Sequence, residues 1–276
     1  MSAQGALRAR DHRSGERTVR YIDEGTGPAL VLLHAFAEDG TLWSPQIRAL
    51  STQRRVIAPD LRGAGGSGRM DGAHAAVVTM DTHADDIVDL MDHLGLQKAV
   101  IGGISLGGYV ALSLVLRYPD RVSGLILANT RAGADSEQGR AQREALALEV
   151  ERRGPQAVVD SFGERPFGPD CSEDAKTFAR SITLRQSIPG LTSFIRGMAQ
   201  RPDRTPALAS IRTPTLIVSG TEDILIPSAE SDAMQRLIAG SHFVDIPRAG
   251  HLSNIDQTDA FNAVVENFLT GSGFVA

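Results

Sequence analysis

The sequence predicts an α/β fold built on a mostly parallel β-sheet with helices on both faces. Short apolar runs, each about as long as one strand, alternate along the chain with longer segments of helical periodicity. The apolar runs are uninterrupted, and strands covered by helices on both faces require such runs. Strands and helices that follow one another in this order are typical of right-handed crossovers between parallel strands.

Six apolar runs supply the expected strands. They lie at residues 29–33, 55–58, 99–102, 124–128, 215–218 and 242–246. Before them, the polar and partly alternating segment 7–23 is expected to form an antiparallel hairpin at one edge of the sheet.

Four segments supply the expected core helices, at residues 79–94, 106–117, 228–238 and 256–269. In the first of these segments the apolar residues recur with a period close to 3.6, and Gly95 follows as a C-cap. The second segment is apolar or small on most faces, as a buried helix should be, and it ends before Pro119.

The alternation stops between residues 131 and 204. This stretch is rich in charged residues, has helical patterning and is punctuated by prolines. We expect it to form a helical cap inserted into the core, which then consists of residues 1–130 and 205–276.

Composition narrows the function. The chain has 276 residues, 42% of them apolar, and a formal net charge of −5, so one core with an insertion accounts for its length. An acidic chain without a basic block is not expected to bind nucleic acid or an anionic membrane. Its single cysteine, Cys171, excludes an internal disulfide. The apolar runs are too short to cross a bilayer and the N-terminus lacks the apolar run of a signal peptide, so we expect a cytoplasmic protein.

Ser105 is the candidate nucleophile. It stands in Gly103-Ile104-Ser105-Leu106-Gly107, which matches the G-x-S-x-G nucleophile elbow,. In that motif the serine sits on a sharp turn between a strand and a helix, and the glycines allow the strand and helix to approach closely. A chain with 28 glycines can match such a motif by chance. The predicted strand before Ser105 and the predicted helix after it favour the functional interpretation.

His251 is the candidate base that takes the serine proton. Only His242 and His251 follow Ser105 in the chain. His242 stands at the start of a predicted strand, at the wrong end of the sheet. His251 follows the same strand by a short loop, and the carboxyl ends of the strands are where active sites of open α/β sheets form.

Asp223 is the candidate acid that orients His251 and stabilises its cation. It follows the predicted strand 215–218 in a short loop. Its neighbour Glu222 competes for the role, but Asp223 has the better position in the turn. The position after strand 124–128 is held by Asn129, which cannot be an anionic partner.

The oxyanion hole needs two fixed N–H donors. The amide of Leu106, the residue after the nucleophile, is the first. We assign the second to Phe36, in the loop that follows strand 29–33. Taken alone, this loop would also fit a plain turn at the end of a strand.

Together these motifs resemble the α/β-hydrolase superfamily, from about residue 20 to the end of the chain. The residues that carry the resemblance are His34-Ala35-Phe36, Asp60-Leu61-Arg62-Gly63-Ala64-Gly65-Gly66-Ser67, Gly103-Ile104-Ser105-Leu106-Gly107-Gly108, Asp223 and Gly250-His251. Within the superfamily the chain is most similar to bacterial carboxylesterases and 3-oxoadipate enol-lactonases. The resemblance implies an eight-stranded, mostly parallel sheet with a helical cap over the site.

Ala35 departs from the family pattern, and Ser105 argues against two branches of the family. The family usually has His-Gly where this chain has His34-Ala35, and the added methyl group can reshape the acyl pocket. Haloalkane dehalogenases and epoxide hydrolases of this fold use an aspartate nucleophile, so Ser105 argues against both.

No cluster of histidine, cysteine and carboxylate residues has the spacing of a zinc site, and we expect no metal and no cofactor.

The substrate pocket is expected to contain mainly apolar residues of the cap and of the core loops. The candidates are His34, Ile104, Phe162, Phe167, Phe194, Met198 and Leu225. Four cap arginines could bind a substrate carboxylate, as an enol-lactone would need, or could simply lie on a solvated helix face. They are Arg165, Arg180, Arg185 and Arg196.

The leading hypothesis for the function is a carboxylesterase for small to medium esters. A lactonase and a cofactor-free perhydrolase would use the same three residues. A non-catalytic ligand receptor on a hydrolase fold is the alternative from a different class, because fold alone does not give function.

Overall fold

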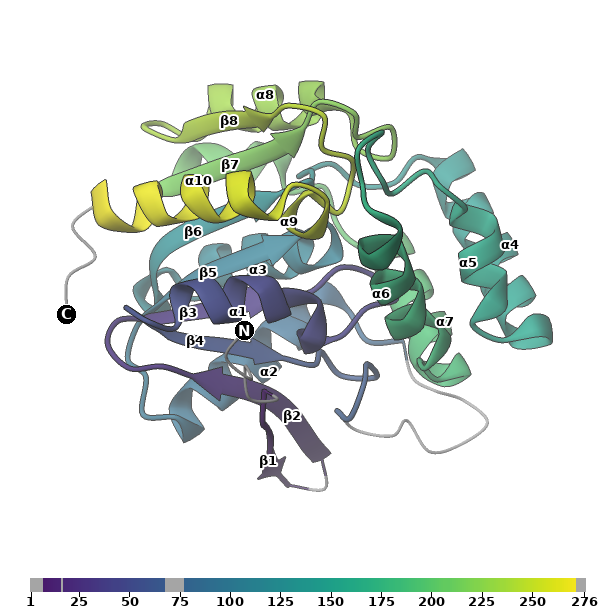
Figure 1. Ribbon diagram of the computed structural model, residues 1–276, viewed down its shortest axis with the longest axis horizontal. Coiled ribbons are helices and arrows are strands. Elements are labelled where there is room, and N and C mark those ends of the chain that lie inside the picture. Colours follow the sequence, from purple (N-terminus) through teal and green to yellow (C-terminus); the bar gives the residue numbers. More distant parts are fainter. Residues whose placement is uncertain (1–6, 16, 68–76, 272–276) are drawn as a thin grey trace.

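The described residues form one eight-stranded sheet between two layers of helices (Figure 1). The computed structural model describes residues 7–15, 17–67 and 77–271. The strands are β1 (Ala9–Ser14), β2 (Arg17–Glu24), β3 (Ala29–Leu33), β4 (Arg55–Pro59), β5 (Ala99–Ile104), β6 (Val122–Ala128), β7 (Thr215–Gly220) and β8 (His242–Ile246). Their order in the sheet is β1-β2-β4-β3-β5-β6-β7-β8.

Strands β3 to β8 run parallel, whereas β1 and β2 form an antiparallel hairpin at the edge, with β2 antiparallel to β4. The predicted fold class and the predicted edge hairpin are confirmed. Several strands are longer than the apolar runs that predicted them. For example, β5 extends to Ile104 because its pairing with β6 continues as far as Ala128.

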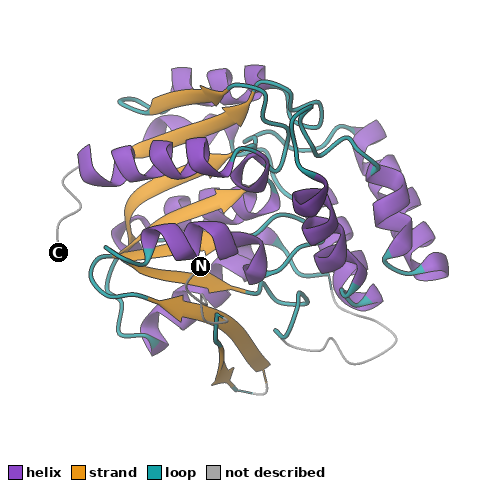
Figure 2. Ribbon diagram, viewed as in Figure 1, coloured by secondary structure: helices purple, strands orange, loops and turns teal. Residues whose placement is uncertain are grey.

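Helices cover both faces of the sheet (Figure 2). On one face lie α2 (Met80–His93), α3 (Leu106–Arg117) and α8 (Ser228–Leu237); on the other lie α1 (Ser44–Leu50), α9 (Ser253–Asp256) and α10 (Thr258–Gly271). Each layer buries its own apolar cluster against the sheet. The short helices α1 and α9 were not predicted, because four to seven residues are too few to show a helical period.

The segment between β6 and β7 contains helices that lie beyond the carboxyl ends of the strands (Figure 1). They are α4 (Glu137–Arg153), α5 (Gln156–Phe162), α6 (Glu173–Leu184) and α7 (Ile188–Ala199), which we call the cap helices. Helices α4, α6 and α7 begin at the serine N-caps Ser136, Ser172 and Ser187, whose side chains accept from backbone amides,. Three short 3₁₀ helices, η1 (Gly40–Trp43), η2 (Pro119–Arg121) and η3 (Thr205–Ser210), complete the assigned elements.

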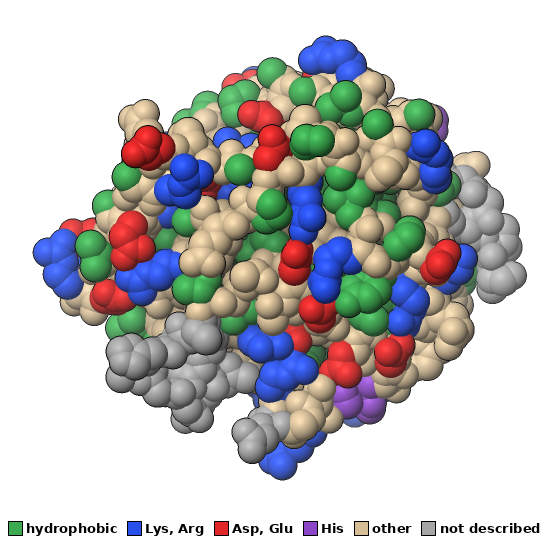
Figure 3. Space-filling view, turned by 180° about the vertical axis from the view of Figure 1, so that it is seen from behind, with side chains coloured by type: hydrophobic (Ala, Val, Ile, Leu, Met, Phe, Trp, Pro, Cys, Tyr) green, Lys and Arg blue, Asp and Glu red, His purple; other side chains and the backbone are tan. Residues whose placement is uncertain are grey.

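The surface on the back of the molecule carries acidic and basic side chains that are interspersed with one another (Figure 3). In the described part of the chain, no helix is both long and apolar enough to cross a bilayer. Residues 1–6, on which the expectation about a signal peptide rests in part, lie outside the described ranges.

Candidate active site

Ser105 occupies a sharp turn between β5 and α3. Its backbone has φ of 54° and ψ of −114°, a region that residues with side chains rarely adopt. A methyl group on Gly103 would lie 2.1 Å from the carbonyl oxygen of Gly107, and one on Gly107 would lie 2.1 Å from that of Leu33. Only glycine fits at these two positions, so the spacing of the motif follows directly from the packing of strand against helix.

The structure brings Ser105, His251 and Asp223 into one hydrogen-bonded chain. The Nε2 atom of His251 lies 2.8 Å from the hydroxyl of Ser105, and its Nδ1 atom lies 2.8 Å from a carboxylate oxygen of Asp223. All three side chains are buried. Asp223 and His251 stand in the loops after β7 and β8, which are neighbouring strands, so the sheet topology places them together. His242, by contrast, is the exposed first residue of β8.

Asp223 is held as a carboxylate by several donors. One of its oxygens accepts from the amides of Leu225 and Ile226, both at 2.9 Å. Burial alone would raise the pKa of Asp223, but His251, the Ile226 amide and the side chain of Asn129 outweigh burial and lower that pKa below its ordinary value,. Its neighbour Glu222 is exposed.

Asn129 is a site residue that sequence reasoning considered only as an unsuitable acid. Its side-chain amide donates to Asp223 at 2.9 Å and to the carbonyl of Gly250 at 3.2 Å. The hydroxyl of Ser253 in turn donates to the Asn129 oxygen at 2.5 Å. Asn129 therefore ties the loop of the acid to the loop of the base. Its position directly after β6, beside the nucleophile strand, was the sequence signal for this role.

The two candidate oxyanion donors follow neighbouring strands, Phe36 after β3 and Leu106 after β5. Leu106 is the first residue of α3, where amides have no partner within the helix,. Phe36 lies in the loop after β3 and contributes to the wall of a cavity above Ser105. Within the described ranges, neither the Phe36 nor the Leu106 amide donates to a protein acceptor. Both amides are thus available to an oxygen that develops negative charge.

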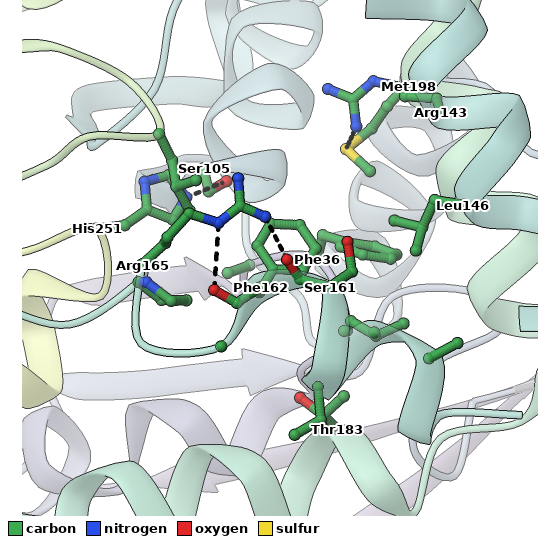
Figure 4. A pocket seen from close by; sticks show the side chains of 18 of the residues that line it. Phe36, Ser105, Arg143, Leu146, Ser161, Phe162, Arg165, Thr183, Met198 and His251 are labelled. Atoms are coloured by element: carbon green, nitrogen blue, oxygen red, sulfur yellow. Dashed lines mark hydrogen bonds between the residues drawn. The ribbon is translucent and has the colours of Figure 1, made fainter. Parts of the chain in front are cut away.

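A cavity of about 970 Å³ opens above Ser105 and His251 (Figure 4). Of the predicted pocket residues, Phe162, Phe167, Met198 and Leu225 line it. Figure 4 shows Phe36 and Phe162 near Ser105 and His251, with Arg143 and Met198 farther along the wall. Ala35 also contributes to the wall, so the residue that departs from the family pattern lies where it can shape the cavity.

Three residues that we expected in the pocket, His34, Ile104 and Phe194, are not among the described residues of its wall. Ile104 is the last residue of β5 and is fully buried in the core. The ring of Phe194 stacks on His83 inside the other core cluster, with centroids 5.2 Å apart. These expectations were wrong because proximity in sequence to the elbow or the cap does not give the side a residue faces.

His34 instead holds the loop of Phe36. Its Nδ1 atom donates to the Ala35 carbonyl at 2.8 Å, and its Nε2 atom accepts from the amide of Leu61 at 3.0 Å. An Nε2 atom that accepts from an amide must be unprotonated, which fixes the ring proton on Nδ1. Burial lowers the pKa of His34, in keeping with a neutral ring that supports the loop rather than touching a substrate.

The four cap arginines considered for a substrate carboxylate already have partners. Arg180 pairs with Glu164, Arg185 with Asp39, and Arg196 with Glu144 and Glu151. Arg165 donates to the backbone carbonyls of Ser161 and Phe162 (Figure 4).

A different group of arginines surrounds Asp135 on the cavity wall. Arg131, Arg143 and Arg201 all donate to this one carboxylate. Burial would raise the pKa of Asp135, but Arg201 and Arg143 outweigh it and lower that pKa well below its usual range. Three guanidinium groups therefore share one carboxylate, and Arg131 and Arg143 line the cavity. Sequence reasoning missed this cluster because its members come from three separate segments.

The comparison with protein families agrees with this geometry. A family model described as the alpha/beta hydrolase fold matches residues 28–258. The chain belongs to the α/β-hydrolase family.

Known members of this family resemble the chain along most of its length. The 3-oxoadipate enol-lactonase 1 of Acinetobacter baylyi is 32% identical and covers 88% of each chain. A solved thermophilic esterase from Thermogutta terrifontis, with malate bound, is 36% identical, has a TM-score of 0.90 and covers 96% of this chain and 99% of its own. The enol-lactonase from Burkholderia xenovorans LB400 is 29% identical, has a TM-score of 0.86 and covers 95% of this chain and 100% of its own.

These relatives confirm the predicted similarity to esterases and enol-lactonases. Because these relatives are named as esterases and lactonases, they also indicate that the chain is a hydrolytic enzyme rather than a non-catalytic receptor. Esters and lactones would react at the same three residues, so the choice between substrates depends on the residues of the cavity wall. Cys171 offers no competing nucleophile, because burial raises the pKa of its thiol to about 12,.

Glu38 is a buried acid on the wall of the cavity, two residues after Phe36. One of its oxygens accepts from the Thr183 hydroxyl at 3.3 Å, and the other has no partner among the described residues. Burial, with Asp39 nearby, raises the pKa of Glu38 well above its ordinary value of 4.5. Glu38 is therefore protonated in the folded protein at pH values where it is ionised in the unfolded chain.

Glu38→Gln should increase stability relative to the wild type, and by more as the pH rises. A folded-state pKa above the unfolded value gives stability that is complete below the unfolded pKa and is lost as pH rises towards the folded pKa. The glutamine side chain does not titrate, so only the wild type loses this stability as the pH rises. The difference in melting temperature between variant and wild type should therefore widen from pH 4.5 to pH 8. Calorimetry measures this difference, with Glu222→Gln as the exposed control. A difference independent of pH would mean that Glu38 is ionised in the fold.

Proposed function

We propose that this α/β-hydrolase cleaves carboxylic esters of small to medium size through an acyl-enzyme on Ser105. The observation that carries the proposal is the hydrogen-bonded chain of Ser105, His251 and Asp223 at the base of the cavity. A serine hydroxyl becomes a useful nucleophile when an adjacent base accepts its proton, and this geometry provides that base.

In the first half of the reaction, the Nε2 atom of His251 takes the Ser105 proton while the hydroxyl oxygen attacks the ester carbonyl carbon. Asp223 stabilises the imidazolium that forms. The tetrahedral intermediate collapses, the bond to the alcohol oxygen breaks, and His251 delivers its proton to that oxygen. A water molecule then attacks the acyl-enzyme in the same way, with His251 again as base, and releases the carboxylic acid and free Ser105.

The amides of Leu106 and Phe36 would stabilise the negative charge that develops on the carbonyl oxygen. Removing one such donor in a serine hydrolase costs roughly 3–4 kcal/mol of barrier. The Leu106 amide also lies at the N-terminus of α3, where the helix dipole favours negative charge.

The cavity supports substrates of limited size with an apolar acyl part. Its wall includes the aromatic and aliphatic residues Phe36, Phe162 and Leu225. Ala35 adds a methyl group to the loop that faces the acyl carbon. We expect short to medium acyl chains to react faster than long ones.

A second candidate, a lactonase for a ring substrate that bears a carboxylate, is favoured by the cationic cluster at Asp135. The chain as a whole carries a net charge of −5, yet Arg131 and Arg143 place excess positive charge on the cavity wall. The relatives named 3-oxoadipate enol-lactonase point to a substrate related to a dicarboxylic acid. A lactone would react by the same steps, with the alcohol leaving group still attached to the acyl part.

Ser105→Ala should leave a folded protein whose ester hydrolysis is reduced by several orders of magnitude. The measurement is turnover of p-nitrophenyl esters from acetyl to octanoyl. Ser113→Ala, at a buried serine on the same helix α3, is the matched control and should keep most of the activity. Near-normal turnover in Ser105→Ala would assign the chemistry to another nucleophile.

Arg143→Gln should separate the two candidate substrates. If the natural substrate bears a carboxylate, the variant should lose about tenfold in kcat/KM on a half-ester of a dicarboxylic acid, because a charge-assisted contact is removed. The same variant should change kcat/KM for the matching neutral diester by less than about threefold. Arg196→Gln, which removes a cap arginine that pairs with Glu144 and Glu151 and is not among the described residues of the cavity wall, is the control. Equal effects on both esters would leave the simple esterase as the function.

A further inference from the structure

We propose that Arg185 of the cap is a positioning residue for the reaction, because it holds the loop that carries the Phe36 amide. This loop, residues 34–39, is called the oxyanion loop below. The inference rests on the proposed function, since it concerns the donor that stabilises the reacting carbonyl oxygen. Arg185 stands just after helix α6, far from the oxyanion loop in the sequence, and reaches it across the junction of cap and core.

The contact between cap and loop is a two-pronged ion pair. The Nε atom of Arg185 donates to one oxygen of the Asp39 carboxylate at 3.0 Å, and a terminal nitrogen donates to the other oxygen at 2.9 Å. Planar pairs of this kind fix both distance and direction. The side chain of Asp39 is only 3% exposed, whereas that of Arg185 is 48% exposed. The buried Asp39 carboxylate is stabilised by its hydrogen-bond donors, and the half-exposed Arg185 supplies the compensating positive charge.

Asp39 links this ion pair to the start of the core. Its carboxylate also accepts from the amide and the hydroxyl of Thr41, at 3.0 Å and 2.6 Å, at the beginning of η1. Gln186, the residue after Arg185, donates to Asp39 at 3.1 Å and accepts from the amide of Gly65 at 2.9 Å. One corner of the cap therefore contacts two core loops.

The oxyanion loop has a second link to the cap through Glu38 and Thr183. The Thr183 hydroxyl donates to Glu38 at 3.3 Å, and both residues line the cavity. The loop thus contacts the cap at two consecutive residues, Glu38 and Asp39, which directly follow Phe36 and Ala37.

The backbone of the loop needs such support. Ala37 has φ of 65°, a left-handed conformation that is unfavourable for a residue with a side chain and persists where surrounding contacts enforce it. The amide of Glu38 closes the turn by donating to the Ala35 carbonyl at 3.3 Å. His34 holds the first end of this turn, and the cap holds its second end. Phe36 lies between these two anchors, so the direction of its amide depends on both.

The chain offers a matched control for the loss of a cap arginine. Arg196 lies on α7 and pairs with Glu144 and Glu151 of α4, within the cap rather than with the core, and it is not among the described residues of the cavity wall. Arg196→Met removes a cap ion pair without touching the oxyanion loop or the cavity. A general effect of cap stability would appear in both variants, whereas a positioning effect would appear only in Arg185→Met.

Steady-state hydrolysis of a p-nitrophenyl ester by Arg185→Met, Arg185→Lys and Arg196→Met tests the inference. Arg185→Met should lose about 10- to 100-fold in kcat with KM changed less than about threefold, as for a misplaced oxyanion donor. Lysine keeps the charge but not the paired geometry, so Arg185→Lys should recover part of the loss. A change confined to KM, or an equal loss in Arg196→Met, would overturn the inference.

Hydrogen exchange of the backbone amides provides a readout that does not depend on turnover. Peptides that cover residues 34–42 should exchange faster in Arg185→Met than in the wild type, and should be unchanged in Arg196→Met. Unchanged exchange in this segment would overturn the inference even if activity fell. If residues 34–42 exchange faster in Arg185→Met as expected but the wild type hydrolyses no ester, only the proposed function is contradicted. The two failures can therefore be told apart.

Discussion

The contact between helix α3 and the strands beneath it is the constraint on which the candidate site depends. Gly107 lies so close to the carbonyl of Leu33 on β3 that any side chain would collide with it. Gly103 is equally close to the backbone of Gly107. This approach leaves Ser105 with a positive φ at the tip of the turn, and its hydroxyl lies 2.8 Å from the Nε2 atom of His251. The strain at one residue is supported by close packing around it.

From that turn the rest of the site follows by sheet topology. Parallel strands end at the same edge, so the loops after β3, β5, β6, β7 and β8 meet there although they are distant in sequence,. The loop after β6 holds Asn129, whose side chain joins the loops of Asp223 and His251 and, together with His251 and the Ile226 amide, lowers the pKa of Asp223. The three side chains therefore have a common support in addition to their contacts with one another.

The sequence predicted the sheet and the loops at its carboxyl edge because both follow from local patterns. Apolar runs specify buried strands, and the glycines around Ser105 specify the turn. The prediction failed where the answer depended on the direction of a side chain in the packed molecule. Phe194 is apolar and lies in the cap segment, yet its ring stacks on His83 in the core. The cluster around Asp135 could not be found, because Arg131, Arg143 and Arg201 are spread along the chain and only the fold collects them.

The cap does more than cover the candidate site, because it also contacts the loops that form the site. Contacts from it reach the oxyanion loop through Thr183, Arg185 and Gln186. Another reaches the loop of the base, since Asp256 accepts from the amides of both Gly168 and Gly250 at 2.6 Å. Thr183 lines the cavity and also contacts the oxyanion loop, so a change at this junction would alter the cavity wall and the support of the loop together. Substrate range and catalytic geometry are linked through these few contacts, and Arg185 is the one whose charge lies nearest the surface.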